Sequence, residues 1–272
     1  MRAYTELRIP FNDNTQKEIL IAQLIELGIE GFEEDKSLLK AFIPTENFDE
    51  KAVETIIGQQ HLNYTKTIIE DRNWNAEWES NFQPVFIHHF CAVRAAFHEA
   101  IPGVQHDIII TPKMSFGTGH HATTHMMIEA MGQLDLKNKS VFDFGTGTGV
   151  LAILAEKCGA ASVIAIDNDD WSIANAKENF NANNCHKALI IKHNEVNMEG
   201  FFDAIFANIN RNIILQNLPG IKQHLASTGV LLLSGLLADD QPVIMAEAEK
   251  YHLKLNGKLE RNGWICLQLI HA

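Results

Sequence analysis

The sequence predicts an α/β protein in which a small ferredoxin-like α+β domain precedes a Rossmann-like domain with a mostly parallel, seven-stranded sheet and an antiparallel last strand. Three observations predict this fold. Residues 1–70 read as β-α-β-β-α-β, the order of the split β-α-β sandwich. From residue 140 onward, strand-like runs alternate with helix-like segments, as in a sheet covered on both faces. The last two strand candidates have no helix between them, so one of them is expected to run antiparallel.

The first 70 residues form the predicted ferredoxin-like domain. Residues 4–9 alternate as a half-buried strand does, and Thr15 with Glu18 predicts a capping box for a helix that ends at Gly28. The remaining elements are expected at residues 31–33, 39–43, 49–58 and 62–69. The two helices would cover one face of the sheet and leave the other face free. Because no catalytic constellation lies in this domain, we expect it to recognise a partner.

An aromatic-rich linker is expected at residues 71–110. It leads into the second domain, which we place at residues 111–272. The first strands of that domain begin within the linker. Trp74, Trp78 and Phe82 are separated by polar residues, which argues against a single core helix. We expect this stretch to pack against the domain that follows. Two short strands are also expected, at residues 85–87 and 107–110.

Strands and helices alternate through the second domain. The run Val163-Ile164-Ala165-Ile166 is continuously apolar, which suits a strand buried on both faces. The expected strands are residues 140–144, 162–167, 188–192, 203–208, 229–234, 252–255 and 264–270. The expected helices are residues 150–158, 171–183, 212–223 and 242–251. Turn signals at Asn256-Gly257 and Asn262-Gly263 are expected to join the last two strands.

Composition excludes several classes of protein. With 272 residues, 46% hydrophobic content and a net charge of -12, the chain can bury a core, and its acidity disfavours direct binding to nucleic acid. The absence of a long apolar run or a secretory signal predicts a cytoplasmic protein without a membrane span. The four cysteines form no Cys-x-x-Cys pair, and His120, His121 and His125 suit loop or cap positions, so no metal site is expected. No apolar heptad repeat indicates obligate assembly, so a monomer is expected.

The acidic charge is concentrated near the start of the chain. Residues 1–70 hold 7 basic and 13 acidic side chains, a net charge of -6, which equals that of the remaining 202 residues. Two interpretations stay open: solubility, or a face that attracts a basic partner.

A glycine-rich turn follows the strand at residues 140–144. Gly145, Gly147 and Gly149 lead directly into a helix, which leaves backbone amides accessible to a nucleotide-like ligand. The dinucleotide fingerprint would place glycine or alanine where Val150 stands.

Two carboxylates bear on the identity of this ligand. Asp143 would repel a pyrophosphate and favour a ligand with a cationic amine, such as S-adenosylmethionine. Asp167, which lies 22 residues beyond Gly145, is placed to accept hydrogen bonds from two ribose hydroxyls.

These motifs together resemble the class I S-adenosylmethionine-dependent methyltransferases, and among them the bacterial family that modifies protein eleven of the large ribosomal subunit. The resemblance is carried by Phe116-Gly117-Thr118-Gly119-His120-His121-Ala122-Thr123-Thr124, Asp143 to Gly149, Asp167-Asn168-Asp169, Ala207-Asn208-Ile209 and Trp78 to Pro84. The resemblance implies that Thr124, Gly145, Asp167 and Asn208 contact the cofactor. Further cofactor-binding residues are expected at Asp143, Phe116, Gly117, Thr118, Gly147 and Gly149. The chain departs from the family at Thr111-Pro112-Lys113, where Asp-Pro-Gly is usual, and at Asp170, where proline is usual.

The segment after the strand at 203–208 bears on the methyl acceptor. Asn208-Ile209-Asn210-Arg211 lacks the Asn-Pro-Pro-Tyr clamp of enzymes that methylate planar amide nitrogens, which points to an aliphatic amine such as a lysine side chain or an N-terminal amine. Asn208 could orient that amine, and His120 or His121 could relay its proton or simply pack in the loop. The implied partner is the basic ribosomal protein. Another protein, a small amine, or a non-catalytic nucleotide-binding scaffold are the alternatives.

Overall fold

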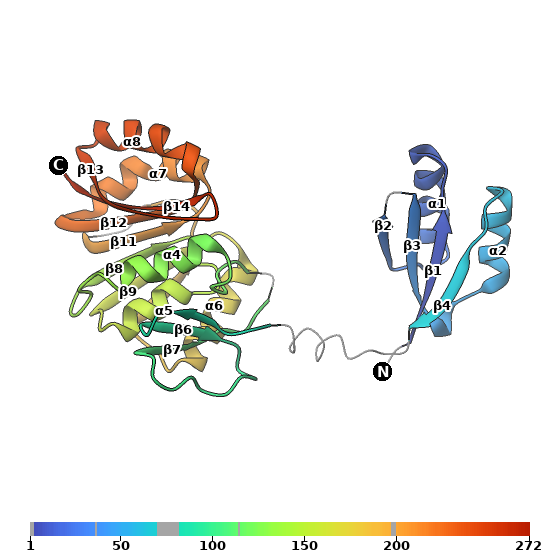
Figure 1. Ribbon diagram of the computed structural model, residues 1–272, viewed down its shortest axis with the longest axis horizontal. Coiled ribbons are helices and arrows are strands. Elements are labelled where there is room, and N and C mark those ends of the chain that lie inside the picture. The colour runs from blue at the N-terminus through green and yellow to red at the C-terminus, as the bar shows by residue number, and fades with distance from the viewer. Residues whose placement is uncertain (1–2, 36, 70–81, 114, 197–199) are drawn as a thin grey trace. The chain divides into compact units, whose positions relative to one another are not determined.

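The chain folds into two compact units, Met1–Asn81 and Phe82–Ala272, each with its own hydrophobic core (Figure 1). The computed structural model describes residues 3–35, 37–69, 82–113, 115–196 and 200–272. Trp74 and Trp78 of the predicted aromatic linker lie outside these residues. Within the described ranges, no helix is long and apolar enough to cross a membrane.

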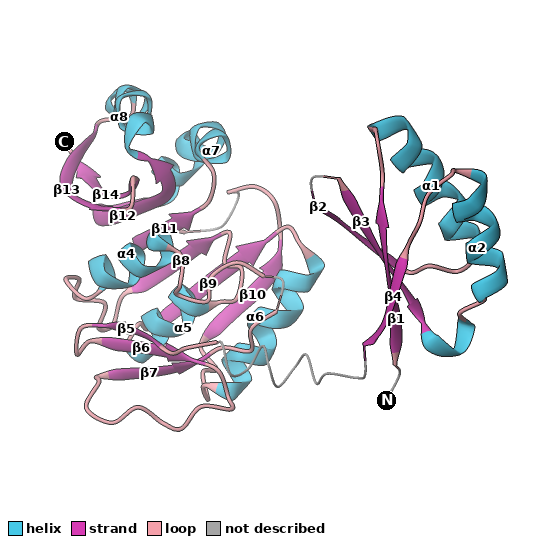
Figure 2. Ribbon diagram, turned by 45° about the vertical axis from the view of Figure 1, so that its right-hand side comes forward, coloured by secondary structure: helices cyan, strands magenta, loops and turns pink. Residues whose placement is uncertain are grey.

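The N-terminal unit is a four-stranded antiparallel sheet with the strand order β2-β3-β1-β4. Its elements are β1 (Tyr4–Pro10), α1 (Asn14–Glu26), β2 (Gly31–Asp35), β3 (Leu38–Pro44), the short 3-10 helix η1 (Thr45–Asn47), α2 (Glu50–Gln59) and β4 (Thr65–Ile69). Both α-helices cover the same face of the sheet (Figure 2). Alternate residues of β1, Leu7 and Ile9, are fully buried beside Leu20 and Leu24 of α1. The predicted β-α-β-β-α-β order is therefore confirmed.

Helix α1 begins two residues earlier than the predicted capping box. Its N-cap is Asp13, whose carboxylate accepts a hydrogen bond from the Gln16 amide at 2.8 Å. The expectation that Thr15 and Glu18 form the cap is wrong, because Asp13 already satisfies the first free amide of the helix. Gly28 follows the helix with a φ of +83°, a left-handed conformation that ends it as predicted.

The C-terminal unit contains a seven-stranded sheet in the order β10-β9-β8-β11-β12-β14-β13. Its strands are β8 (Ser140–Phe144), β9 (Ser162–Asp167), β10 (Ala188–Lys192), β11 (Phe202–Asn208), β12 (Leu225–Leu237), β13 (Leu253–Arg261) and β14 (Trp264–His271). Strand β14 runs antiparallel to its neighbours, β12 and β13, as predicted for the last strand. Asn262-Gly263 connects the last two strands, whereas Asn256-Gly257 is not the predicted turn but an irregular step within β13.

Helices cover both faces of this sheet (Figure 1). The helices are α4 (Ala122–Met131), α5 (Val150–Lys157), α6 (Asp170–Ala182), α7 (Arg211–His224) and α8 (Gln241–Lys250), with a short 3-10 helix η2 (Ala238–Asp240). One hydrophobic cluster joins α4, α5 and α6 to one face, and a second joins α7 and α8 to the other. A separate three-stranded sheet, β5 (Val85–Ile87), β6 (Cys91–Arg94) and β7 (His106–Ile109), packs beside α4 and α5.

The strand order places a topological switch point between β8 and β11. These strands are hydrogen-bonded neighbours, yet β8 leads to β9 on one side and β11 leads to β12 on the other. In open α/β sheets, ligands bind beyond the carboxyl ends of strands at such a point. The glycine-rich turn after β8 and Asn208 at the end of β11 both lie there.

Candidate active site

A cavity of about 440 Å³ opens beyond the carboxyl ends of β8, β9 and β11. Five of the predicted site residues line it: Phe116, Gly145, Gly147, Asp167 and Asn208. Its size falls in the range of small-molecule sites. Further lining residues were not predicted, and they come from the loop after β10 and the start of α7: His193, Asn194, Glu195, Asn210, Ile213, Gln216 and Asn217.

The glycine turn forms a wall without side chains. Gly145 and Gly147 have φ angles of +77° and +55°, which glycine adopts without strain. A Cβ atom at Gly145 would lie 2.3 Å from the Ile209 side chain, and one at Gly147 would lie 2.3 Å from the Phe116 carbonyl oxygen. The turn therefore needs glycine for its backbone conformation and for its close contacts with Ile209 and Phe116.

The Asp167 carboxylate is held in place by backbone amides. Its Oδ2 atom accepts from the Gly147 amide at 2.9 Å, and its Oδ1 atom accepts from the Asp169 amide at 3.1 Å. Each carboxylate oxygen can accept a second hydrogen bond. The half-buried side chain lines the cavity, and its contact with two hydroxyl groups stays a prediction.

Asp143 lies behind the turn and does not line the cavity. Its side chain is buried and accepts a hydrogen bond from the Thr146 hydroxyl at 2.6 Å. Burial raises the pKa of Asp143 to about 7; the Thr146 hydrogen bond opposes this rise and the nearby Asp167 adds to it. Asp143 does not line the cavity, and its Oδ1 atom is buried without a hydrogen-bond partner among the described residues, so its contact with a ligand stays a prediction.

Asn208 lines the cavity from the end of β11. Its Nδ2 atom donates to the Thr124 hydroxyl at 3.2 Å, and Thr124 itself is fully buried and does not line the cavity. The Oδ1 atom of Asn208 is buried and has no hydrogen-bond partner among the described residues. Asp143 Oδ1 and Asn175 Oδ1 are likewise buried without a hydrogen-bond partner among the described residues, so this state does not by itself identify a ligand.

A smaller cavity of about 250 Å³ adjoins the first and shares Phe116, Asn208, Ile209 and Asn210 with it. Aromatic rings form much of its wall: the centroid of the His121 ring lies 5.2 Å from that of Phe116 and 4.8 Å from that of Trp264. His121 also caps α4, because its Nδ1 atom accepts from the Thr123 amide. Trp264 was not predicted as a site residue, since β14 lies 140 residues beyond Thr124 in the sequence.

His120 lies outside both cavities. Its Nε2 atom bonds the Gln83 carbonyl oxygen at 2.9 Å, and its ring meets the edge of Phe82 at 4.6 Å between centroids. Two others of the predicted residues, Gly117 and Thr118, also line neither cavity, nor does Gly149 of the glycine turn.

Comparisons with known proteins find similar sequences over most of the chain. The family described as "Ribosomal protein L11 methyltransferase (PrmA)" matches residues 9–271. The chain is 40% identical to the ribosomal protein L11 methyltransferase of Porphyromonas gingivalis over 263 residues, which cover 93% of this chain and 90% of that protein. It is 39% identical to the Chlorobaculum tepidum protein of the same name, over 89% of this chain and 88% of that protein.

Solved structures of methyltransferases are similar to this chain. A ribosomal protein L11 methylase from Lactobacillus delbrueckii subsp. bulgaricus matches with a TM-score of 0.65 and 28% identity, over 70% of this chain and 99% of that chain. A methyltransferase from Pyrococcus furiosus matches with a TM-score of 0.52 at 18% identity, over 60% of this chain and 88% of that chain, which shows the fold alone.

Proposed function

The chain belongs to the ribosomal protein L11 methyltransferase family, and on that premise we propose that it transfers methyl groups from S-adenosylmethionine to amino groups of ribosomal protein L11. Family membership contradicts the alternative of a non-catalytic scaffold, because the family is one of methyltransferases. The observation that carries the proposal is the place of Asn208, which lines both cavities and is held by its hydrogen bond to Thr124.

The residues of the larger cavity fit the cofactor. Asp167 would accept the ribose hydroxyls, and Gly145 and Gly147 would allow the ligand to approach the backbone closely. S-adenosylmethionine, when bound, supplies an electrophilic methyl group on a sulfonium. Asp143 supports the turn by accepting the hydrogen bond from Thr146.

The smaller cavity suits the methyl acceptor. Phe116, His121 and Trp264 give it an aromatic lining that would pack against the methylene chain of a lysine side chain. The amine at the end of that chain would donate to Asn208 Oδ1, whose amide is oriented by its bond to Thr124. An in-line displacement requires that the amine is held in a fixed position and that water is excluded. The aromatic rings would exclude the water.

The amine must lose a proton before it can attack. A lysine ammonium has an ordinary pKa of about 10.4, and an apolar environment lowers it because burial disfavours the charged form. His121 lines the acceptor cavity and is the candidate proton relay, while His120 is bonded to the Gln83 carbonyl and lies outside both cavities. We therefore assign His120 no part in the chemistry.

A methylation assay tests the proposal. The purified chain is incubated with radiolabelled S-adenosylmethionine and ribosomal protein L11, and mass spectrometry locates the methyl groups. We expect labelled amines with the wild-type chain and at least about a hundredfold slower transfer with Asn208→Ala, which removes both the oriented amide and the acceptor. Cofactor binding without labelled L11 would contradict the substrate assignment and favour another protein or a small amine.

A further inference from the structure

Three buried asparagines lie four residues apart on one side of α6 and its C-terminal end. Asn175, Asn179 and Asn183 are 1%, 0% and 7% exposed. A buried amide destabilises the fold unless its polar atoms are hydrogen-bonded. Asn175 donates from Nδ2 to the Thr111 carbonyl at 3.1 Å, and its Oδ1 atom has no partner among the described residues. Asn179 and Asn183 use both polar atoms of their amides.

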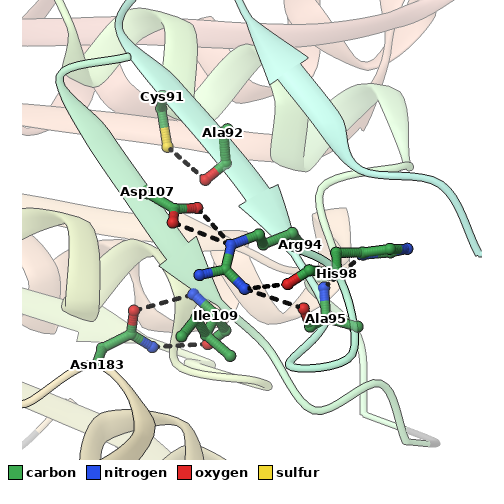
Figure 3. A network of polar contacts seen from close by, with 8 residues as sticks. All are labelled: Cys91, Ala92, Arg94, Ala95, His98, Asp107, Ile109 and Asn183. Atoms are coloured by element: carbon green, nitrogen blue, oxygen red, sulfur yellow. Dashed lines mark hydrogen bonds and ion pairs between the residues drawn. The ribbon is translucent and has the colours of Figure 1, made fainter. Parts of the chain in front are cut away.

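Asn183 pairs with the backbone of β7. Its Oδ1 atom accepts from the Ile109 amide at 2.9 Å, and its Nδ2 atom donates to the Ile109 carbonyl at 2.6 Å (Figure 3). The other edge of β7 pairs with β6, where Arg94 forms an ion pair with Asp107 at 2.9 Å. Strand β7 is an edge strand of the three-stranded sheet, and Asn183 hydrogen-bonds the edge that faces away from β6. Asn183 lines neither cavity.

Asn179 joins two segments that meet at the cofactor cavity. Its Oδ1 atom accepts from the Thr111 amide at 2.8 Å, and its Nδ2 atom donates to the Thr148 carbonyl at 2.8 Å. Thr148 belongs to the glycine turn, and its amide donates to the Phe116 carbonyl at 2.9 Å. The Thr148 hydroxyl donates to the Gly117 carbonyl at 2.7 Å. Asn179 thus bonds Thr148, which directly follows Gly147 of the cavity lining.

We propose that Asn179 is a positioning residue for the cofactor cavity, an inference that rests on the proposed function. Its single amide bonds both Thr111 and the glycine turn, whereas Asn175, one helical turn earlier, bonds only the Thr111 carbonyl. The Phe116 carbonyl oxygen lies so close to Gly147 that a Cβ atom at Gly147 would clash with it. Loss of the Asn179 amide would release the glycine turn from α6, and Phe116 and Gly117, which are bonded to Thr148, would shift with it.

Two alanine variants separate positioning from general stability. Asn179→Ala and Asn183→Ala each remove a buried amide from the same helix, but only Asn179 contacts the glycine turn. Affinity for S-adenosylhomocysteine is measured by calorimetry, and thermal midpoints report the cost to folding. We expect both midpoints to fall, but the dissociation constant to rise by about tenfold or more only in Asn179→Ala. Equal dissociation constants in the two variants would overturn the inference.

A milder pair of variants covers the case in which an alanine variant does not fold. Asn179→Asp keeps an acceptor for the Thr111 amide but places an oxygen against the Thr148 carbonyl, so it cuts only the bond to the glycine turn. Asn183→Asp is its matched control. Weaker binding in Asn179→Asp alone supports the inference, and equal binding in both contradicts it. If the wild-type chain binds neither S-adenosylmethionine nor S-adenosylhomocysteine, the proposed function fails instead.

Discussion

At the scale of single residues, Asp167 is the proposed acceptor for the ribose hydroxyls, and a backbone amide holds each of its two oxygens. Asp167→Ala removes the charged acceptor for two hydroxyl groups. We expect the variant to bind S-adenosylmethionine more weakly by about 1–3 kcal/mol in calorimetry. Asp167→Asn keeps the shape and one acceptor, so it should lose less. An unchanged affinity in Asp167→Ala would contradict the proposed cofactor site.

Asp143 gives a prediction about pH. Its folded-state pKa of about 7 lies above its ordinary value of 3.8, so the folded chain holds this proton more tightly than the unfolded chain does. The stability that the proton contributes is present at low pH and is lost as the pH rises from about 4 to about 7. Asp143→Asn removes this dependence and still offers an acceptor to Thr146.

Unfolding by urea at pH 5 and pH 8 measures that difference. Relative to the wild type, Asp143→Asn should gain roughly 1–3 kcal/mol of unfolding free energy between pH 5 and pH 8. Other titrating groups affect both proteins alike, so they cancel in the comparison. A constant difference between the two proteins at both pH values would mean that the Asp143 pKa is not raised in the folded state.

At the scale of elements, the glycine turn combines a left-handed backbone with a close approach to Phe116. Gly103 has a φ of +84°, but a Cβ atom added there would meet no atom within 4 Å, whereas a Cβ on Gly147 would strike a backbone oxygen. Gly103→Ala should therefore cost only about 1–2 kcal/mol of unfolding free energy. Gly147→Ala should cost more and should also weaken cofactor binding by at least about tenfold. Similar losses in both variants would show that the close approach has no effect.

The sequence predicted elements well where burial follows a simple pattern. The expected bounds of β8, β9 and β10 match the structure. The continuous apolar run of β9 identified a strand in the interior of the sheet, whereas β10 is an edge strand without a fully buried residue. Helix α4 was missed, since it is buried on nearly every side and shows no amphipathic stripe. Strand β6 was missed as well, and all of its four residues are buried.

The site was predictable only as far as its motifs reach. Residues that line the cavity through turns after β8 and β9 were found, because strand ends and glycine spacing indicate them. The role of Asn179 could not be predicted, since its partners are backbone groups of Thr111 and Thr148, 68 and 31 residues away. Neither could Trp264 be assigned to the acceptor cavity, because the pairing of β14 with β12 brings it there.

At the scale of the whole molecule, the acidic charge of residues 1–70 predicts a dependence of substrate recognition on salt. A net charge of -6 in this segment would speed encounter with a basic protein, and added salt screens such attraction. We expect kcat/KM for L11 to fall by about tenfold or more between about 50 and about 300 mM salt. The affinity for S-adenosylhomocysteine, which carries no sulfonium charge, should change little and serves as the control.

Charge variants decide between the two interpretations of this acidity. Glu46 and Glu54 line an acidic depression near the start of α2, whereas Glu99 and Glu249 are exposed acids of the C-terminal unit. The double variants Glu46→Gln/Glu54→Gln and Glu99→Gln/Glu249→Gln change the net charge equally. If the N-terminal unit attracts L11, KM for L11 should rise severalfold in the first variant alone. If both variants keep the wild-type KM, the acidic surface serves solubility, and recognition of L11 depends on shape and apolar contact instead.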